Sequence, residues 1–157
     1  MSVRTTSCGT LGWISDAQGY RYEPKDALTE QPWPPMPQNF IDLASNAANE
    51  AGFNDFTPDS CLINSYVAGA KMSLHQDKNE RDFSAPIVSV SLGLSAFFLF
   101  GGNTRSERMQ RYRLEHGDVV VWGGSSRMKF HGIEPLIDGT HQLLGRQRIN
   151  LTFRKVI

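Results

Sequence analysis

The chain of 157 residues lacks the features that would assign it to a special class of protein. Its two cysteines, Cys8 and Cys61, are too few for a disulfide framework and form no Cys-x-x-Cys pair. No apolar run approaches the roughly 20 residues that span a bilayer, and the opening MSVRTTSCGTLGW contains no apolar segment of a secretory signal. These absences predict a cytoplasmic protein without a membrane partner, in which Cys61 is a buried small hydrophobic residue.

An excess of charge of one sign is also absent, because 16 Lys and Arg residues balance 16 Asp and Glu residues. A nucleic-acid partner would therefore need a local basic patch rather than the field of the whole molecule. The segment TRSERMQRYR is such a patch, with four arginines against one glutamate; they are Arg105, Arg108, Arg111 and Arg113. The alternative for this segment is an exposed charged hairpin without a binding role.

The length and a hydrophobic fraction of 39% predict one domain with a core of its own. Residues 1–37 are rich in Gly, Pro and aromatic residues, which predicts turns and short strands around TLGW and GYRYEP. The next segment, PQNFIDLASNAANEAGF, places apolar residues at helical spacing and predicts a helix that ends at Gly52.

From Cys61 onward the chain changes character. The segments CLINSYV, PIVSVSLGL, AFFLFG, RYRLEHGDVVVW, MKFHGI and RINLTF are short, rich in β-branched and aromatic residues, and separated by glycine-containing turns. Such a series predicts an all-β sandwich or a closed, barrel-like roll.

One candidate metal site begins in the stretch LHQDKNE. On a strand, His75 and Asp77 would point to the same face, because side chains alternate with a period of two. A second histidine, His131, lies in the strand-like segment MKFHGI. Two histidines and one carboxylate are the ligands of facial-triad Fe(II) sites, which keep positions open for substrate and oxygen. The alternative for His75 and Asp77 is an ordinary polar loop; His116 and His141 are predicted to be turn residues without a role.

The C-terminal strand RINLTFR carries its polar residues on one face. That face holds Arg148, Asn150, Thr152 and Arg154. Two inward guanidiniums are costly to bury without anions, and arginine suits carboxylates. A 2-oxoacid with a second carboxylate could chelate iron at one end and supply the anions that both guanidiniums need. Asn64 and Tyr66 share one strand face and could complete this cradle; the alternatives are a solvated polar face for the C-terminal strand and ordinary packing for Asn64 and Tyr66.

These segments together resemble the AlkB family of Fe(II)- and 2-oxoglutarate-dependent nucleic-acid dioxygenases, and most closely the bacterial DNA-repair members. The resemblance rests on LINSYVAGAKMSLHQDKNE, APIVSVSLGL, LEHGDVVVWGG, SRMKFHGI and RINLTFR, and it extends to TLGW and QGYRYEP. It implies a mainly β, double-stranded β-helix (jelly-roll) fold with one or two supporting helices and an N-terminal substrate lid. It also implies that 1-methyladenine and 3-methylcytosine are oxidised with O2 and 2-oxoglutarate, with release of formaldehyde, succinate and carbon dioxide.

The resemblance assigns roles to individual residues. Iron would be held by His75, Asp77 and His131. The 2-oxoglutarate contacts would come from Asn64, Tyr66, Arg148, Asn150 and Arg154, with Arg148 and Tyr66 at the far carboxylate and Arg154 nearer the metal. The damaged base would lie between Trp13 and His131, whereas Tyr20 and Arg105 would contact the nucleic acid. Core packing is the alternative for Trp13 and Tyr20.

Two features depart from the family pattern. Asn79 stands where the bacterial repair enzymes commonly have an aspartate that helps to read the base, and an amide can donate as well as accept a hydrogen bond. Family members also carry additional N-terminal sequence, so we expect either a truncated or a compact member.

The resulting expectation is one monomeric dioxygenase domain over residues 1–157, with a lid at 1–37 and a jelly-roll core at 61–157. Alkylated DNA, or alternatively RNA, would be its partner, and no protein partner is implied. Two other functions compete with this one. They are a 2-oxoglutarate oxygenase for a protein or small molecule, and a non-catalytic nucleic-acid-binding β-roll.

Overall fold

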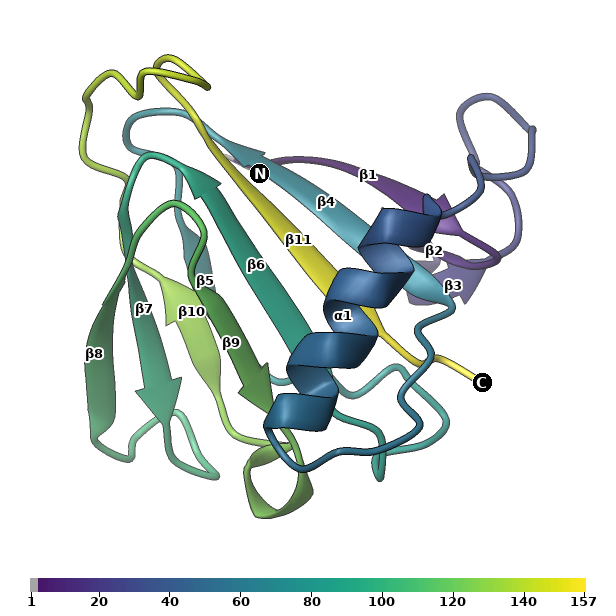
Figure 1. The fold of residues 1–157 in the computed structure, drawn as a ribbon. Helices are drawn as coiled ribbons and strands as arrows, with labels where there is room; N and C mark the ends of the chain where they lie inside the picture. Colours follow the sequence, from purple (N-terminus) through teal and green to yellow (C-terminus); the bar gives the residue numbers. More distant parts are fainter. Residues whose placement is uncertain (1–2) are drawn as a thin grey trace.

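Two antiparallel sheets face each other in the computed structural model, which describes residues 3–157 (Figure 1). The major sheet has the order β1-β4-β11-β6-β9, formed by Arg4–Gly9, Ser60–Tyr66, Arg148–Arg154, Ile87–Gly93 and Val119–Trp122. The minor sheet has the order β5-β10-β7-β8, formed by Met72–His75, His131–Ile133, Ala96–Gly101 and Met109–Leu114. This arrangement is the predicted jelly roll, and most of its strands coincide with the β-branched and aromatic segments of the sequence.

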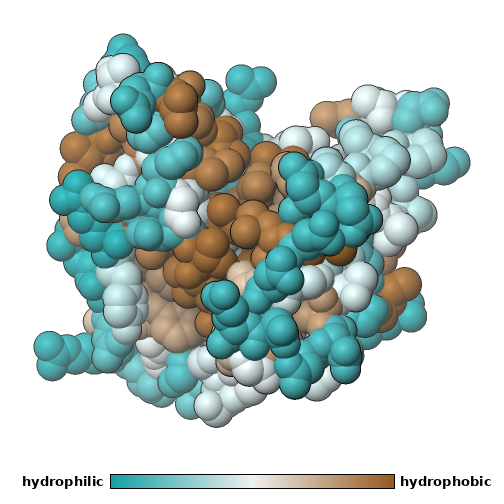
Figure 2. Space-filling model, viewed as in Figure 1, coloured by the Kyte–Doolittle hydropathy of each residue, from teal (hydrophilic) through white to brown (hydrophobic). Residues whose placement is uncertain are grey.

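One helix, α1 (Gln38–Glu50), lies across the outer face of the major sheet (Figure 1). Its small buried residues Ala44 and Ala48 belong to one apolar cluster with Val88 and Phe153 of the sheet. The helix was predicted from its apolar spacing, and the chain leaves it at Gly52, which adopts a φ of +94° that favours glycine. An apolar surface lies beside α1 on the face shown in Figure 2. Within residues 3–157, no helix is long and apolar enough to cross a membrane.

A second apolar cluster fills the space between the two sheets. Ile87 and Trp122 of the major sheet meet Phe98 and Ile133 of the minor sheet there. The ring of Trp122 lies 5.0 Å from that of His131. His131, one of the candidate metal residues, therefore sits against a packed core.

The N-terminal segment forms strands as predicted, and it also contributes to the core. β2 (Gly12–Asp16) and β3 (Gly19–Glu23) make a separate two-stranded hairpin. β1, however, pairs with β4 in the major sheet, so Cys8 lies directly opposite Cys61. Both cysteines are buried and free, which confirms the prediction for Cys61. The division into a lid and a core stays a prediction.

Candidate active site

His75, Asp77 and His131 come together at one point between the sheets. Each offers one ligand atom, and these three atoms lie within 4.8 Å of one another. Oδ1 of Asp77 is 3.6 Å from Nε2 of His75 and 3.5 Å from Nε2 of His131. The two histidines face each other across β5 and β10, where they are direct partners in the register. Two imidazole nitrogens and one carboxylate oxygen at these separations suit a single divalent cation.

Neighbouring groups orient each of the three candidate ligands. Nδ1 of His75 lies 2.7 Å from the carbonyl oxygen of Ser73, and Nδ1 of His131 lies 3.2 Å from that of Lys129. An Nδ1–H that donates to a carbonyl leaves Nε2 as the lone-pair nitrogen, which is the form that binds a metal. Nε of Arg154 donates to Oδ2 of Asp77 at 2.7 Å, so Oδ1 faces the histidines.

The charges of the cluster suit metal binding. Burial alone would raise the pKa of Asp77, but Arg154 and the two histidines outweigh it and hold that pKa well below its ordinary value. Burial, followed by the neighbouring His131, lowers the pKa of His75. The site therefore offers an ionised carboxylate and a neutral imidazole at neutral pH, as metal ligation requires.

One part of the geometric prediction was wrong. His75 is the last residue of β5, and Asp77 lies beyond it in an irregular loop over residues 76–86. The strand alternation that was expected to align the two side chains therefore does not act at Asp77. Contacts to the loop, described below, place its carboxylate instead.

The polar face of β11 lines the same cleft, as its period of two predicted. Its alternate apolar residues Ile149, Leu151 and Phe153 belong to the cluster under α1. Arg148 is only 1% exposed and is the direct partner of Tyr66, with its guanidinium 4.9 Å from the phenol ring. Burial lowers the pKa of Arg148, while Tyr66 opposes that shift.

Several buried polar atoms in this region have no hydrogen-bond partner within the described residues. Nη2 of Arg148 donates to Oγ of Ser91 at 3.1 Å, whereas its Nε and Nη1 atoms have no partner, and neither does Oδ1 of Asn64. Unpartnered buried donors are costly. The two unpartnered donors of Arg148 fit an anionic ligand in the cleft, which is the role the arginine pattern predicted.

Asn150 lines the cleft but is already engaged within the sheet. Its Nδ2 donates to Oγ of Ser89 at 2.8 Å and to the carbonyl of Val90 at 3.1 Å, and its Oδ1 accepts from Thr152 at 2.7 Å. These contacts hold one amide face rigid beside Arg148.

One cleft of about 680 Å³ unites the candidate residues for metal, cosubstrate and substrate. Trp13, Tyr20, Asn79 and Arg105 all line it together with the metal cluster. The rings of Trp13 and Tyr20 are stacked, with centroids 5.2 Å apart and planes at 13°. Nε of Arg105 donates to the carbonyl of Leu74 at 3.4 Å. A planar, polar molecule can therefore reach the metal position by passing the aromatic rings of Trp13 and Tyr20.

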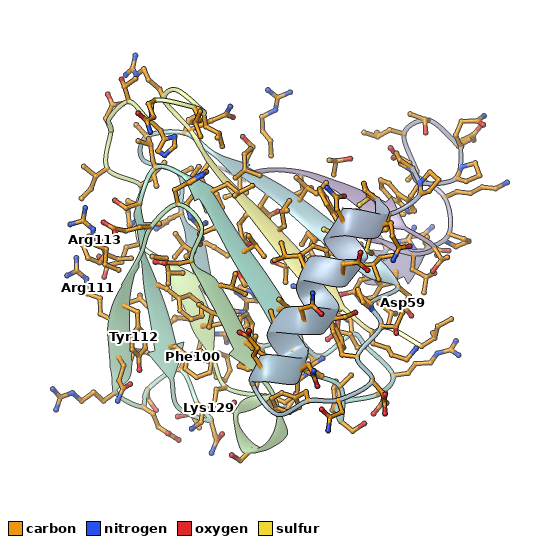
Figure 3. The ribbon with its side chains drawn as sticks, viewed as in Figure 1. Asp59, Phe100, Arg111, Tyr112, Arg113 and Lys129 are labelled. Atoms are coloured by element: carbon orange, nitrogen blue, oxygen red, sulfur yellow. The ribbon has the colours of Figure 1, made fainter. Side chains whose placement is uncertain are left out.

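The other arginines of the basic segment lie on the outside of β8 or beside it. Arg111 and Arg113 project away from the molecule (Figure 3). Arg111 pairs with Glu134 at 2.8 Å and covers the ring of Phe97, and Arg113 pairs with Glu115 at 3.4 Å. Among the four, Arg105 alone lines the cleft. These contacts favour the alternative of a charged hairpin for Arg111 and Arg113.

Three residues beside the metal cluster were missed by the sequence analysis: Tyr22, Glu80 and Arg127. Arg127 and Glu80 form an ion pair of 2.5 Å and are 3% and 6% exposed, and Tyr22 donates to Glu80 at 2.7 Å. Glu80 lies in the charged run QDKNERD, which reads as a solvated loop. No periodic pattern links it to Arg127, 47 residues away.

Comparison with known proteins agrees with this geometry. The profile of the 2OG-Fe(II) oxygenase superfamily matches residues 1–154. The chain is 59% identical to the alpha-ketoglutarate-dependent dioxygenase AlkB of Escherichia coli K12, over 99% of this chain and 72% of that protein. It is 29% identical to the tRNA demethylase abh1 of Schizosaccharomyces pombe, over 93% of this chain and 53% of that protein. The solved structure of OsALKBH1 superimposes with a TM-score of 0.86 at 30% identity, covering 99% of this chain and 78% of that one.

The family and the site agree on the cofactors. A matched oxygenase profile over nearly the whole chain and a His-Asp-His cluster support Fe(II), 2-oxoglutarate and O2 as its reactants. The chain belongs to the AlkB family of Fe(II)- and 2-oxoglutarate-dependent dioxygenases.

Proposed function

We propose that this enzyme removes N-alkyl groups from nucleobases such as 1-methyladenine and 3-methylcytosine in DNA, with RNA as the alternative substrate. A single observation carries the proposal. One cleft contains the metal cluster, the unpartnered donors of Arg148, and the aromatic rings of Trp13 and Tyr20. A relative of the same family that is named a tRNA demethylase supports a methylated nucleic acid as substrate.

The proposed metal ligands are Nε2 of His75, Oδ1 of Asp77 and Nε2 of His131. These three residues would hold the cation and would leave part of its coordination open to a 2-oxoacid and O2. Arg154 would hold the Asp77 carboxylate in place through its bond to Oδ2. Fe(II) with 2-oxoglutarate and O2 supplies the oxidation of the N-methyl group, which leaves as formaldehyde, while 2-oxoglutarate is converted to succinate and carbon dioxide.

The proposed site for the far carboxylate of 2-oxoglutarate lies at Arg148. Its unpartnered Nε and Nη1 atoms can each donate to an anionic oxygen there, and the phenol of Tyr66 lies against the same guanidinium. Oδ1 of Asn64 lacks a partner nearby, and the amide of Asn150 is fixed alongside by Ser89 and Thr152. This wall orients the cosubstrate and excludes water from its buried end.

The proposed base site lies between Trp13 and His131. Bases drawn out of their stack gain attraction from aromatic faces, independent of sequence. Tyr20 and Arg105 would contact the nucleic-acid strand at the mouth, and Asn79 would face the base edge. The β2–β3 hairpin, which carries Trp13, Tyr20 and Tyr22, is the proposed lid. We further propose a monomer, because one chain supplies all of these residues.

The test is a formaldehyde-release assay on oligonucleotides that contain 1-methyladenine or 3-methylcytosine, with Fe(II), ascorbate and 2-oxoglutarate. The expected result is formaldehyde that depends on both iron and 2-oxoglutarate. Formation of succinate without formaldehyde would support a 2-oxoglutarate oxygenase and would indicate a protein or small-molecule substrate instead. Tight binding of the oligonucleotide without either product, in a folded and iron-loaded protein, would favour the non-catalytic alternative.

A further inference from the structure

The loop that carries Asp77 has no helix or strand to define its shape. Residues 76–86 connect β5 to β6 without regular structure. Two acidic side chains of this loop, Asp77 and Glu80, are nevertheless only 6% exposed each. Buried carboxylates require cationic or hydrogen-bonding partners, so the partners of these two residues determine the conformation of the loop.

Arg127 binds the loop at three points. Its Nη1 donates to the carbonyl oxygen of Asp77 at 2.8 Å, its Nε to the carbonyl oxygen of Ala85 at 3.1 Å, and its Nη2 to Oε1 of Glu80 at 2.5 Å. The guanidinium is 3% exposed. One side chain thus closes the loop at its beginning, middle and end, and it holds the backbone of the residue whose carboxylate faces the two histidines.

Glu80 extends these contacts to the hairpin over the cleft. Its second oxygen, Oε2, accepts a hydrogen bond of 2.7 Å from the hydroxyl of Tyr22 on β3. Tyr22 also lines the cleft. A continuous chain of contacts therefore runs from the Asp77 backbone through Arg127 and Glu80 to the β2–β3 hairpin.

Two buried ion pairs in this region explain why the contacts of the loop and the hairpin are coupled. Arg154 neutralises the Asp77 carboxylate at 2.7 Å, and Arg127 neutralises Glu80 at 2.5 Å. Removing one partner of a buried pair leaves an unpaired charge, so neither pair can open independently without a large cost. A shift of the hairpin that moves Glu80 must therefore also move Arg127 and the carbonyl that it holds.

We propose that Arg127 is a positioning residue for the metal ligand Asp77, and that Glu80 and Tyr22 couple this ligand loop to the β2–β3 hairpin. The proposal rests on the assignment of Asp77 as a metal ligand. Its consequence is that metal binding and closure of the hairpin over a base stabilise each other. Groups that orient metal ligands from outside have a measurable effect on metal affinity even though they touch no metal.

The first test is Arg127→Lys with Mn(II) as the probe. A single ammonium keeps the charge beside Glu80 but cannot reach both carbonyls and the carboxylate together. The expected result is a Mn(II) dissociation constant raised about 10-fold or more, as for other outer contacts of metal sites. Arg146→Lys is the matched control, because Arg146 forms an exposed pair with Asp138, and neither residue is among those that line the cleft. Unchanged Mn(II) affinity in folded Arg127→Lys would overturn the positioning role.

The second test is Tyr22→Phe, which removes one hydroxyl and leaves the Arg127–Glu80 pair intact. Hydrogen exchange of the backbone amides is followed with and without Mn(II) in the wild type and the variant. We expect Mn(II) to protect both residues 76–86 and strand β3 in the wild type, and only residues 76–86 in Tyr22→Phe. Equal protection of β3 in both proteins would overturn the coupling, and this measurement decides that part of the proposal even if Arg127→Lys fails to fold.

These measurements are independent of the substrate. Mn(II) binding and amide exchange need neither turnover nor a nucleic acid, so a wrong choice of substrate leaves them unaffected. Absence of Mn(II) binding in the wild type would overturn the metal site itself, whereas wild-type binding with unaltered variants would overturn the roles of Arg127, Glu80 and Tyr22 and leave the metal site standing.

Discussion

Nε of Arg154 donates a 2.7 Å hydrogen bond to Oδ2 of Asp77, in a pair that is buried on both sides. The arginine therefore selects which carboxylate oxygen faces the histidines. It also explains how an ionised aspartate persists in the interior, since burial alone would favour its neutral form. The C-terminal strand thus serves the metal cluster at one end and, through Arg148, the proposed cosubstrate site at the other.

Replacement of Asp77 separates the metal chemistry from nucleic-acid binding. We expect Asp77→Ala to lower kcat for formaldehyde release by more than about 100-fold, because even outer contacts of metal sites cost about 10- to 100-fold. Binding of a methylated oligonucleotide, measured by fluorescence anisotropy, should be largely kept. Unchanged turnover would contradict the assignment of the metal site.

The same replacement has a cost in stability, which needs its own control. Asp77→Ala leaves Arg154 buried without a partner, and breaking a buried pair destabilises by about 3–5 kcal/mol. Asp77→Asn keeps an oxygen for Arg154 and should fold more stably in urea than Asp77→Ala. Both variants should be equally inactive if the loss is one of metal ligation.

Arg148 controls affinity for the cosubstrate in the proposed site. Arg148→Lys replaces a planar group with several fixed donors by a single point charge, which cannot reproduce the donor directions of the guanidinium. We expect the KM for 2-oxoglutarate to rise at least about 10-fold, which corresponds to about 1.4 kcal/mol, with a smaller change in kcat. Initial rates across a range of 2-oxoglutarate concentrations measure this split. A KM equal to that of the wild type would argue that the unpartnered nitrogens of Arg148 serve another ligand.

The face of β11 that lines the cleft could be predicted because strand alternation depends only on local sequence. Residues 148–154 show this pattern clearly, and the structure confirms it. The same argument did not apply to Asp77, since β5 ends two residues earlier. The position of Asp77 depends on Arg127, which is distant in sequence and has no periodic signal. Long-range pairing of single charged residues is therefore the part of the site that local patterns could not reveal.

Trp13 tests the proposed base site. Base–aromatic stacking contributes about 1–3 kcal/mol per base, so Trp13→Ala should raise the KM for a methylated oligonucleotide by about 5- to 150-fold. The KM for 2-oxoglutarate should not change, because Trp13 lies on the hairpin rather than on β11. Leu28→Ala, at an exposed position of the same N-terminal segment, is the control. An equal effect on both substrates would indicate that Trp13 supports the fold and not the base.

Asn79 tests how the enzyme distinguishes lesions. 1-Methyladenine and 3-methylcytosine carry a positive charge at neutral pH, whereas 3-methylthymine is neutral. Asn79 lines the cleft and is exposed, so it offers these bases a dipole but no charge. Asn79→Asp adds a carboxylate, and exposed charge pairs contribute about 0.2–1 kcal/mol. We therefore expect kcat/KM for the two cationic lesions to rise by up to about fivefold relative to 3-methylthymine.

The control is a variant that removes the Asn79 amide without adding a charge. Asn79→Ala should change the three lesions by similar factors, because it adds no attraction for a cation. The kinetics of 2-oxoglutarate should stay constant in both variants, since Asn79 lies in the loop after β5 and not on β4 or β11, which carry the proposed carboxylate site. If Asn79→Asp leaves the ratio of cationic to neutral lesions at the wild-type value, the residue does not face the base, and the base edge must be read by another part of the cleft.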